Sequence, residues 1–182
     1  MNFYITEWGH DPKNDSGYDG GFSAAHTAAV ASEMVGKLQR GFVFEIQDGK
    51  DPAGKEYWGR WGLFTASEFG MKSKPRYAAL RLIDNIGTQR LQLLGKGSWV
   101  KGMAAKSGDA VTVILANYDP FGRHGETVPV TFTNLTNQSF LLNETYLDGT
   151  RKAQQVATTE AALQVAVPML PNSVVFMQLS PQ

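Results

Sequence analysis

The chain has 182 residues, enough for one large domain or two small ones, and 42% are hydrophobic, an ordinary fraction for a globular protein. Its 17 basic and 17 acidic residues cancel, which argues against nucleic-acid or membrane partners held by bulk charge. No membrane-length apolar run or signal-peptide pattern is present, so we expect a soluble protein. The lack of cysteine excludes disulfides and thiolate metal sites but leaves the localisation unknown.

The first dozen residues have the pattern of a buried strand that ends at a carboxylate. Residues 2–6 are mostly apolar or β-prone, and Glu7, Trp8 and Gly9 follow. Chemistry in parallel sheets collects beyond the carboxyl ends of the strands, so Glu7 is the candidate catalytic residue. The alternative is a surface glutamate that closes an ordinary strand.

A βαβ unit is predicted next. A polar loop over residues 10–21 precedes a helix that we expect from Ser23, its cap, to about Gln39. A second strand over residues 41–47 then leads to Asp48. Two strands separated by one helix should be parallel, with a right-handed crossover.

A long loop over residues 49–74 carries an unusual density of aromatic side chains. This density is typical either of a sugar-stacking surface or of a loop that packs under its own side chains. A second helix is expected from Pro75 to a glycine stop at Gly87. The aromatic side chains of the loop are Tyr57, Trp58, Trp61, Phe64 and Phe69.

Beyond Gly87 the hydrophobic period changes from helical to alternating. Short β-prone runs separated by turns predict an antiparallel sandwich. Pro129 and Pro168 fit best at edges or strand ends. We place strands at residues 90–94, 99–105, 110–117, 127–133, 140–147, 163–167 and 174–179.

The first part of the chain is too short to close a barrel. A (β/α)8 barrel takes about 250 residues and eight strands, whereas residues 1–87 supply two strands and two helices. Two parallel strands leave apolar faces and backbone edges that need neighbours. The simplest interpretation is the C-terminal end of a longer protein. The alternative is a compact unit whose strands join or pack on the sandwich.

Several stretches resemble a known enzyme family. Residues 5–9 (Ile-Thr-Glu-Trp-Gly) and 22–29 resemble the nucleophile strand and following helix of clan A glycoside hydrolases, most closely family 39. Residues 41–49 resemble the eighth barrel strand, and residues 74–79 (Lys-Pro-Arg-Tyr-Ala-Ala) the entry to the last helix. The family includes β-xylosidases, α-L-iduronidases and bacterial exopolysaccharide hydrolases. The resemblance covers the whole chain, although only the Thr-Glu-Trp and Lys-Pro-x-Tyr-Ala stretches are fairly specific.

The resemblance implies an α/β plus all-β fold class. Residues 1–87 would be the C-terminal portion of a TIM-like (β/α)8 barrel, its last two βα units, and residues 88–182 an antiparallel β-sandwich accessory domain. Glu7 would be the nucleophile of a retaining mechanism, which forms a glycosyl-enzyme ester. The family's acid/base belongs to an Asn-Glu pair on the fourth barrel strand, which this chain lacks. The sandwich pair Asn143-Glu144 does not take that role, so the chain alone is expected to be inactive or very weak.

Further residues are candidates for binding the carbohydrate substrate. Trp8 either lines a sugar subsite or packs in the barrel, and His10 begins the loop beyond the first strand. Glu45 and Asp48 end the second strand, where they hydrogen-bond the sugar or orient loops. Trp58 is the substrate-binding candidate on the aromatic loop. We expect no cofactor and find no convincing metal-site spacing.

Two other classes of function compete with a hydrolase fragment. One is a non-catalytic carbohydrate-binding module, in which the sandwich and the aromatic loop bind the sugar and Glu7 is incidental. The other is an assembly or truncation product, whose exposed strands make it self-associate without any evolved function. The expected partners of these strands are thus another copy of the chain or the missing N-terminal barrel portion.

Overall fold

The computed structural model describes residues 2–50, 52–95, 97–136, 139–158 and 160–182. The first half contains two strands, two α-helices and two 3-10 turns: β1 (Tyr4–Trp8), η1 (Ser16–Asp19), α1 (Gly21–Met34), β2 (Arg40–Val43), η2 (Ser67–Phe69) and α2 (Pro75–Asp84). The second half is made of strands: β3 (Gln89–Leu91), β4 (Val100–Ser107), β5 (Ala110–Asn117), β6 (Glu126–Thr133), β7 (Ser139–Tyr146), β8 (Arg151–Ala157), β9 (Ala162–Met169) and β10 (Ser173–Pro181).

The predicted parallel pairing of the first two strands is confirmed. Strands β1 and β2 pair in parallel, with Trp8 opposite Val43, and α1 connects them. However, β2 ends at Val43 rather than at residue 47. The chain then changes partner, because the backbone of Glu45 bonds to the carbonyl of Trp61 (2.9 Å) and to the N–H of Leu63 (2.9 Å). The residues after β2 therefore pair with the long loop.

Helix α1 differs from its predicted bounds at both ends. It begins at Gly21, so Ser23 lies inside the first turn and is buried instead of capping the helix. It ends at Met34 rather than near Gln39, because Val35 leaves the helical conformation (ψ 124°). Gly36 follows with φ +81°, a conformation that favours glycine and turns the chain toward β2.

The second half forms two antiparallel sheets, as the alternating pattern predicts. One sheet has six strands in the order β3-β4-β5-β10-β7-β8, and the other pairs β6 with β9. Pro129 and Pro168 lie in the smaller sheet, where each strand has a free edge, in agreement with the prediction. An apolar core joins the facing sides, with Leu115, Phe132 and Met177 among its buried members.

The sequence reasoning missed strand β8. No strand was placed between residues 147 and 163, but Arg151–Ala157 pairs with β7 at the edge of the larger sheet. Its side chains are nearly all exposed. An exposed edge strand buries no apolar face, so it leaves no hydrophobic alternation in the sequence.

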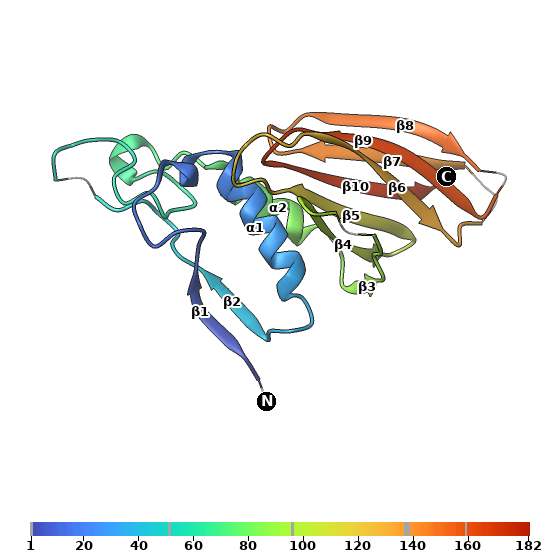
Figure 1. Cartoon of the computed structure of the whole chain (residues 1–182), viewed down its shortest axis with the longest axis horizontal. Helices are drawn as coiled ribbons and strands as arrows, with labels where there is room; N and C mark the ends of the chain where they lie inside the picture. The colour runs from blue at the N-terminus through green and yellow to red at the C-terminus, as the bar shows by residue number, and fades with distance from the viewer. Residues whose placement is uncertain (1, 51, 96, 137–138, 159) are drawn as a thin grey trace.

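The larger sheet has a second core on its other face, where α1 and α2 cover it (Figure 1). Small side chains on α1 allow it to approach the sheet closely. Because both faces are covered, β5 and β10 are almost continuously buried. The two halves of the chain therefore share a core, whose buried members are Ala25, Ala28, Ala29, Leu82, Met103, Ile114, Ala116, Val174 and Phe176.

Strands β1 and β2 extend away from the helices and the sandwich (Figure 1). Large apolar side chains on and next to them are exposed: Phe3 by 54%, Tyr4 by 55%, Phe42 by 51% and Ile46 by 69%. In the described residues, neither helix is long and apolar enough to cross a membrane.

Candidate functional site

A cleft of about 510 Å³ lies at the carboxyl end of β1, and Glu7 lines it from an exposed position. The strand ends here because Gly9 passes directly over the buried ring of Tyr18. A Cβ on Gly9 would lie 2.2 Å from the Tyr18 hydroxyl, so only glycine fits. The residues that line the cleft are Glu7, Trp8, Gly9, Asp11, Pro12, Tyr18, Phe44 and Trp61.

Tyr18 anchors the loop that follows Gly9. Its hydroxyl donates to the carbonyl of Asp11 (2.7 Å) and accepts from the N–H of the same residue (3.2 Å). The Asp11 carboxylate accepts a hydrogen bond from the backbone of Lys13 (2.7 Å). The cleft wall beside Glu7 is therefore held by a buried ring rather than by a regular element.

Arg76, fully buried at the start of α2, ties the strand ends together. Its guanidinium donates to the carbonyls of Trp8 (2.9 Å), Phe44 (2.7 Å) and Trp61 (3.0 Å). It also bonds the hydroxyl of Thr27 on α1 (3.2 Å). Burial lowers the pKa of Arg76 to about 10, which still leaves it charged at neutral pH. Arg76 thus fixes the carboxyl ends of β1 and β2 against both helices.

His10 lies beside the cleft but does not line it. Its side chain is only 4% exposed and packs on Tyr18, with ring centroids 3.9 Å apart. Nε2 lies 3.2 Å from Oδ1 of Asp15, while burial lowers the pKa of His10 against the opposing effect of that carboxylate. His26 packs nearby at 6.0 Å, and burial lowers its pKa to about 4. His26 is therefore a packing residue.

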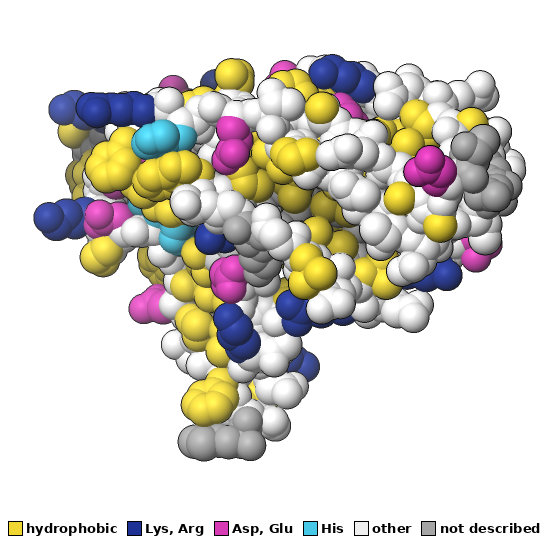
Figure 2. Space-filling model, turned by 45° about the vertical axis from the view of Figure 1, so that its right-hand side comes forward, with side chains coloured by type: hydrophobic (Ala, Val, Ile, Leu, Met, Phe, Trp, Pro, Cys, Tyr) yellow, Lys and Arg dark blue, Asp and Glu magenta, His cyan; other side chains and the backbone are white. Residues whose placement is uncertain are grey.

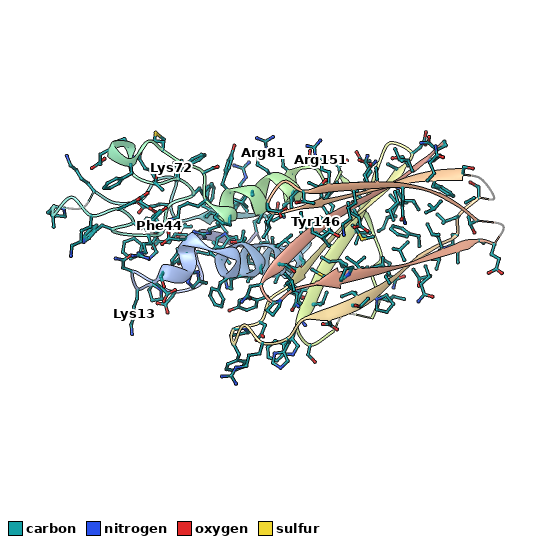
Figure 3. All side chains as sticks on the ribbon, turned by 90° about the horizontal axis from the view of Figure 1, so that it is seen from above. Lys13, Phe44, Lys72, Arg81, Tyr146 and Arg151 are labelled. Atoms are coloured by element: carbon teal, nitrogen blue, oxygen red, sulfur yellow. The ribbon has the colours of Figure 1, made fainter. Side chains whose placement is uncertain are left out.

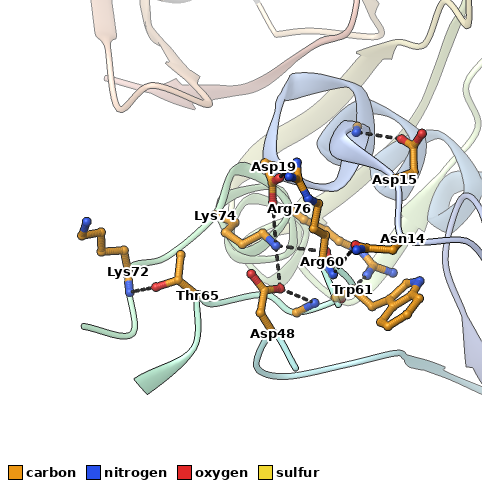
Figure 4. A network of polar contacts seen from close by, with 12 residues as sticks. Asn14, Asp15, Asp19, Asp48, Arg60, Trp61, Thr65, Lys72, Lys74 and Arg76 are labelled. Carbon is orange, nitrogen blue, oxygen red and sulfur yellow. Dashed lines mark hydrogen bonds and ion pairs between the residues drawn. The ribbon is translucent and has the colours of Figure 1, made fainter. Parts of the chain in front are cut away.

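Asp48 lies in a buried ion network instead of the cleft (Figure 4). One carboxylate oxygen accepts from Nζ of Lys74 (2.7 Å) and from the N–H of Gly62 (2.9 Å). Lys74 also pairs with Asp19 (2.8 Å), which in turn pairs with Arg60 (2.9 Å). Burial raises the pKa of Asp48, and the ammonium group of Lys74 opposes this rise. The network joins the polar loop, the aromatic loop and α2.

The remaining predicted substrate contacts are dispersed. Trp8 lines the cleft with Glu7, so the structure brings these two candidates together. Glu45 lies beyond the end of β2, where burial, aided by Asp48, raises its pKa. Trp58 is 47% exposed on the aromatic loop, outside the cleft lining. The substrate-binding roles of His10, Glu45, Asp48 and Trp58 remain predictions.

Sequence reasoning missed residues that build the cleft. Phe44 and Trp61 line it, and their rings lie 6.2 Å apart. Trp61 belongs to the aromatic loop, so its residue type was a signal, but its position was not. The burial of Tyr18 and Arg76 could not be predicted, because polar residues surround both in the sequence. In the described parts of the chain, no three His, Asp or Glu side chains are grouped to hold a metal ion.

Comparison with known proteins gives a match at the level of structure. No protein-family model matches the sequence, and no curated protein matches it. Solved structures do match over the whole chain. The family 39 glycoside hydrolase from Xanthomonas axonopodis pv. citri superposes with a TM-score of 0.75 at 16% identity, with 100% of this chain covered. The chain therefore shares the fold of the matching part of this enzyme.

Other glycoside hydrolases agree with this fold. A monomeric β-xylosidase from Caulobacter crescentus CB15 has a TM-score of 0.72 at 20% identity over 100% of this chain. A family 30 xylanase from Clostridium acetobutylicum has a TM-score of 0.66 at 13% identity over 98% of it. The chain spans less than half of each neighbour, 45%, 46% and 42% of their lengths in the order given. The sheets and helices match the C-terminal domain of the family 39 enzymes.

Proposed function

We propose that this chain is the nucleophile-bearing, C-terminal part of a retaining glycoside hydrolase. Residues 1–87 supply the last two βα units of the barrel, and residues 88–182 the sandwich. The observation that carries the proposal is the position of Glu7, exposed in a cleft at the carboxyl end of a parallel strand. This is where barrel enzymes hold their catalytic groups.

In the proposed mechanism Glu7 attacks the anomeric carbon of the bound sugar. The resulting glycosyl-enzyme ester is hydrolysed by water in a second step. A retaining site needs a second carboxyl about 5–5.5 Å away, protonated at rest, to assist the leaving group. We infer that a barrel strand outside this chain supplies it. Trp8 and Trp61, which line the cleft beside Glu7, would flank the sugar ring.

The exposed strands support the same proposal. Phe42 and Ile46 present large apolar side chains to solvent on and next to β2. In a barrel these faces and the free strand edges would be covered by neighbouring βα units. The remaining barrel strands are thus the proposed partner of this surface, and the carbohydrate substrate would bind where the two parts meet.

The test is the loss of hydrolysis in a completed enzyme. One form of this enzyme adds the barrel half that in-frame codons upstream would encode. The other form is the Caulobacter β-xylosidase in which this chain replaces the segment that it matches. We expect Glu7→Gln to lower kcat by at least about 10³-fold, because the covalent step is lost. Glu144→Gln, a matched change on the sandwich, should leave kcat unchanged. A Glu7→Gln enzyme with normal turnover would favour the non-catalytic carbohydrate-binding alternative.

A further inference from the structure

A second group of aromatic side chains lies on the sandwich, outside the lining of the Glu7 cleft. The rings of Trp99 and His124 are stacked, 4.5 Å apart and inclined by 12°. Phe121 stands edge-on to Trp99 at 6.1 Å and 84°. Phe121 is 67% exposed, and the side chain of His124 is 47% exposed. We call these three residues the aromatic platform.

A buried carboxylate holds the platform in place. Asp119, 0% exposed, accepts hydrogen bonds from the backbone N–H of Phe121 (2.8 Å) and His124 (2.7 Å). Its oxygen also lies 2.9 Å from Nδ1 of His124. Burial alone would raise the pKa of Asp119, but these bonds hold it below its usual range. Asn117 secures the turn further by bonding the carbonyl of His124 (2.7 Å).

Packing in the core does not explain this turn. The turn is ordered by several hydrogen bonds, yet the ring that it carries, Phe121, faces water instead of the core. A rigid exposed ring loses little conformational entropy when a ligand binds to it. His124 covers one face of Trp99, whereas most of Phe121 is exposed to solvent. The space-filling view shows hydrophobic and histidine side chains together on one side of the molecule (Figure 2).

We propose that the aromatic platform binds a carbohydrate chain. The electron-rich face of an aromatic ring attracts the weakly positive C–H groups of a sugar. The exposed neighbours Arg123 and Glu126 have opposite charges, which suits a neutral ligand with many hydroxyls. A stable protein interface takes about 20–30 residues on each side, far more than three rings and a turn.

Ring contacts lead from the chain next to the platform to the cleft. Tyr118, which precedes Asp119, packs on His26 at 5.2 Å, and His26 packs on Trp8 at 6.2 Å. The choice of a carbohydrate rests on the proposed glycosidase function, but binding at the platform requires neither Glu7 nor hydrolysis.

The experiment measures binding of xylohexaose and cellohexaose to the intact 182-residue chain by calorimetric titration. We expect Phe121→Ala to weaken binding about threefold to tenfold, which is the contribution of one aromatic contact. Phe121 is exposed, so its removal should leave the fold intact. Leu94→Ala, at a side chain that is 77% exposed elsewhere on the sandwich, is the matched control and should not change binding.

Two results would overturn the platform. One is a wild-type chain that binds neither sugar at millimolar concentration. The other is equal binding by the wild-type chain and Phe121→Ala. Either result would refute binding at the platform. If Glu7→Gln still abolishes hydrolysis in the completed enzyme, the proposed function would nevertheless stand. Concentration-dependent association of the chain that Phe121→Ala abolishes would instead assign the platform to contacts between copies, and also refute it.

Discussion

The hydrogen bonds that Arg76 makes in the described chain all end on neutral oxygens. Its guanidinium also lies over the rings of Trp8 and Tyr18, at 5.8 and 5.3 Å from their centroids. The Lys-Pro-x-Tyr-Ala stretch predicted the helix entry, and α2 indeed begins at Pro75. The burial of Arg76 could not be predicted, because arginine is rarely fully buried and its acceptors here are carbonyls distant in sequence.

Arg76→Ala should therefore destabilise the chain by about 3–5 kcal/mol, since it leaves buried carbonyls without donors. Arg76→Lys should recover only part of this loss, because an ammonium group cannot reach the same acceptors as the planar fork. The measurement is urea denaturation. Arg81→Ala on the exposed side of α2 (Figure 3) is the control, expected within about 0.5 kcal/mol of wild type. A mild effect of Arg76→Ala would contradict its role as the tie between strand ends.

His26 should make the chain less stable in acid. Its pKa is lowered to about 4 in the folded chain, from 6.5 when unfolded, so the unfolded state binds the proton more readily. The penalty is absent above pH 6.5 and grows as the pH falls from 6.5 to about 4. Between pH 7 and pH 5 it amounts to about 2 kcal/mol.

The free energy of unfolding at pH 7 and pH 5 measures this effect. His26→Gln should reduce that difference by about 2 kcal/mol. An unchanged pH dependence in His26→Gln would show that His26 is not the group responsible.

At the scale of elements, β5 shows what an alternating pattern can and cannot predict. A strand over residues 110–117 within an antiparallel sandwich was predicted, and β5 pairs antiparallel with β4 and β10. The covering of both faces was not predicted, because it depends on the docking of α1 and α2. Strand β8 and the early end of α1 were missed because neither an exposed edge strand nor a glycine turn produces a hydrophobic period in the sequence.

Neighbouring residues of β5 should consequently be equally sensitive. Ile114 faces the helices and Leu115 faces the smaller sheet, and both are buried. We expect Ile114→Ala and Leu115→Ala each to cost about 2–5 kcal/mol in denaturation. On β6, which is covered on one face, Thr131→Ala should cost no more than about 0.5 kcal/mol. A small effect at Ile114 would show that the helices do not form a core with the sheet.

At the scale of the whole molecule, the sandwich buries its apolar faces, whereas β1 and β2 leave theirs exposed. The sequence predicted this from the number of strands, because two parallel strands cannot bury their own faces. The cleft was only partly predictable. Glu7 and Trp8 stood out by their position after an apolar run, whereas Tyr18, Phe44 and Trp61 reach the cleft through loops whose course has no local signal.

The open strands should make the isolated chain self-associate. Ile46, 69% exposed beside β2, is part of this apolar surface. We expect Ile46→Lys to shift the chain toward monomer in sedimentation velocity, since a charge opposes apolar and edge-to-edge association. Leu94→Lys, at a similarly exposed apolar side chain on the sandwich, should have no such effect. Equal effects of both changes would indicate a general gain in solubility instead of a specific surface.

Covalent trapping of the nucleophile tests the central proposal most directly. The completed enzyme would be incubated with 2-deoxy-2-fluoro glycosyl fluorides of xylose and glucose, whose glycosyl-enzyme esters are hydrolysed slowly, and then digested for mass spectrometry. We predict one label per chain, on the peptide that contains Glu7, and no label in Glu7→Gln. A label on another carboxylate, or full labelling of Glu7→Gln, would contradict the assignment of Glu7 as the nucleophile.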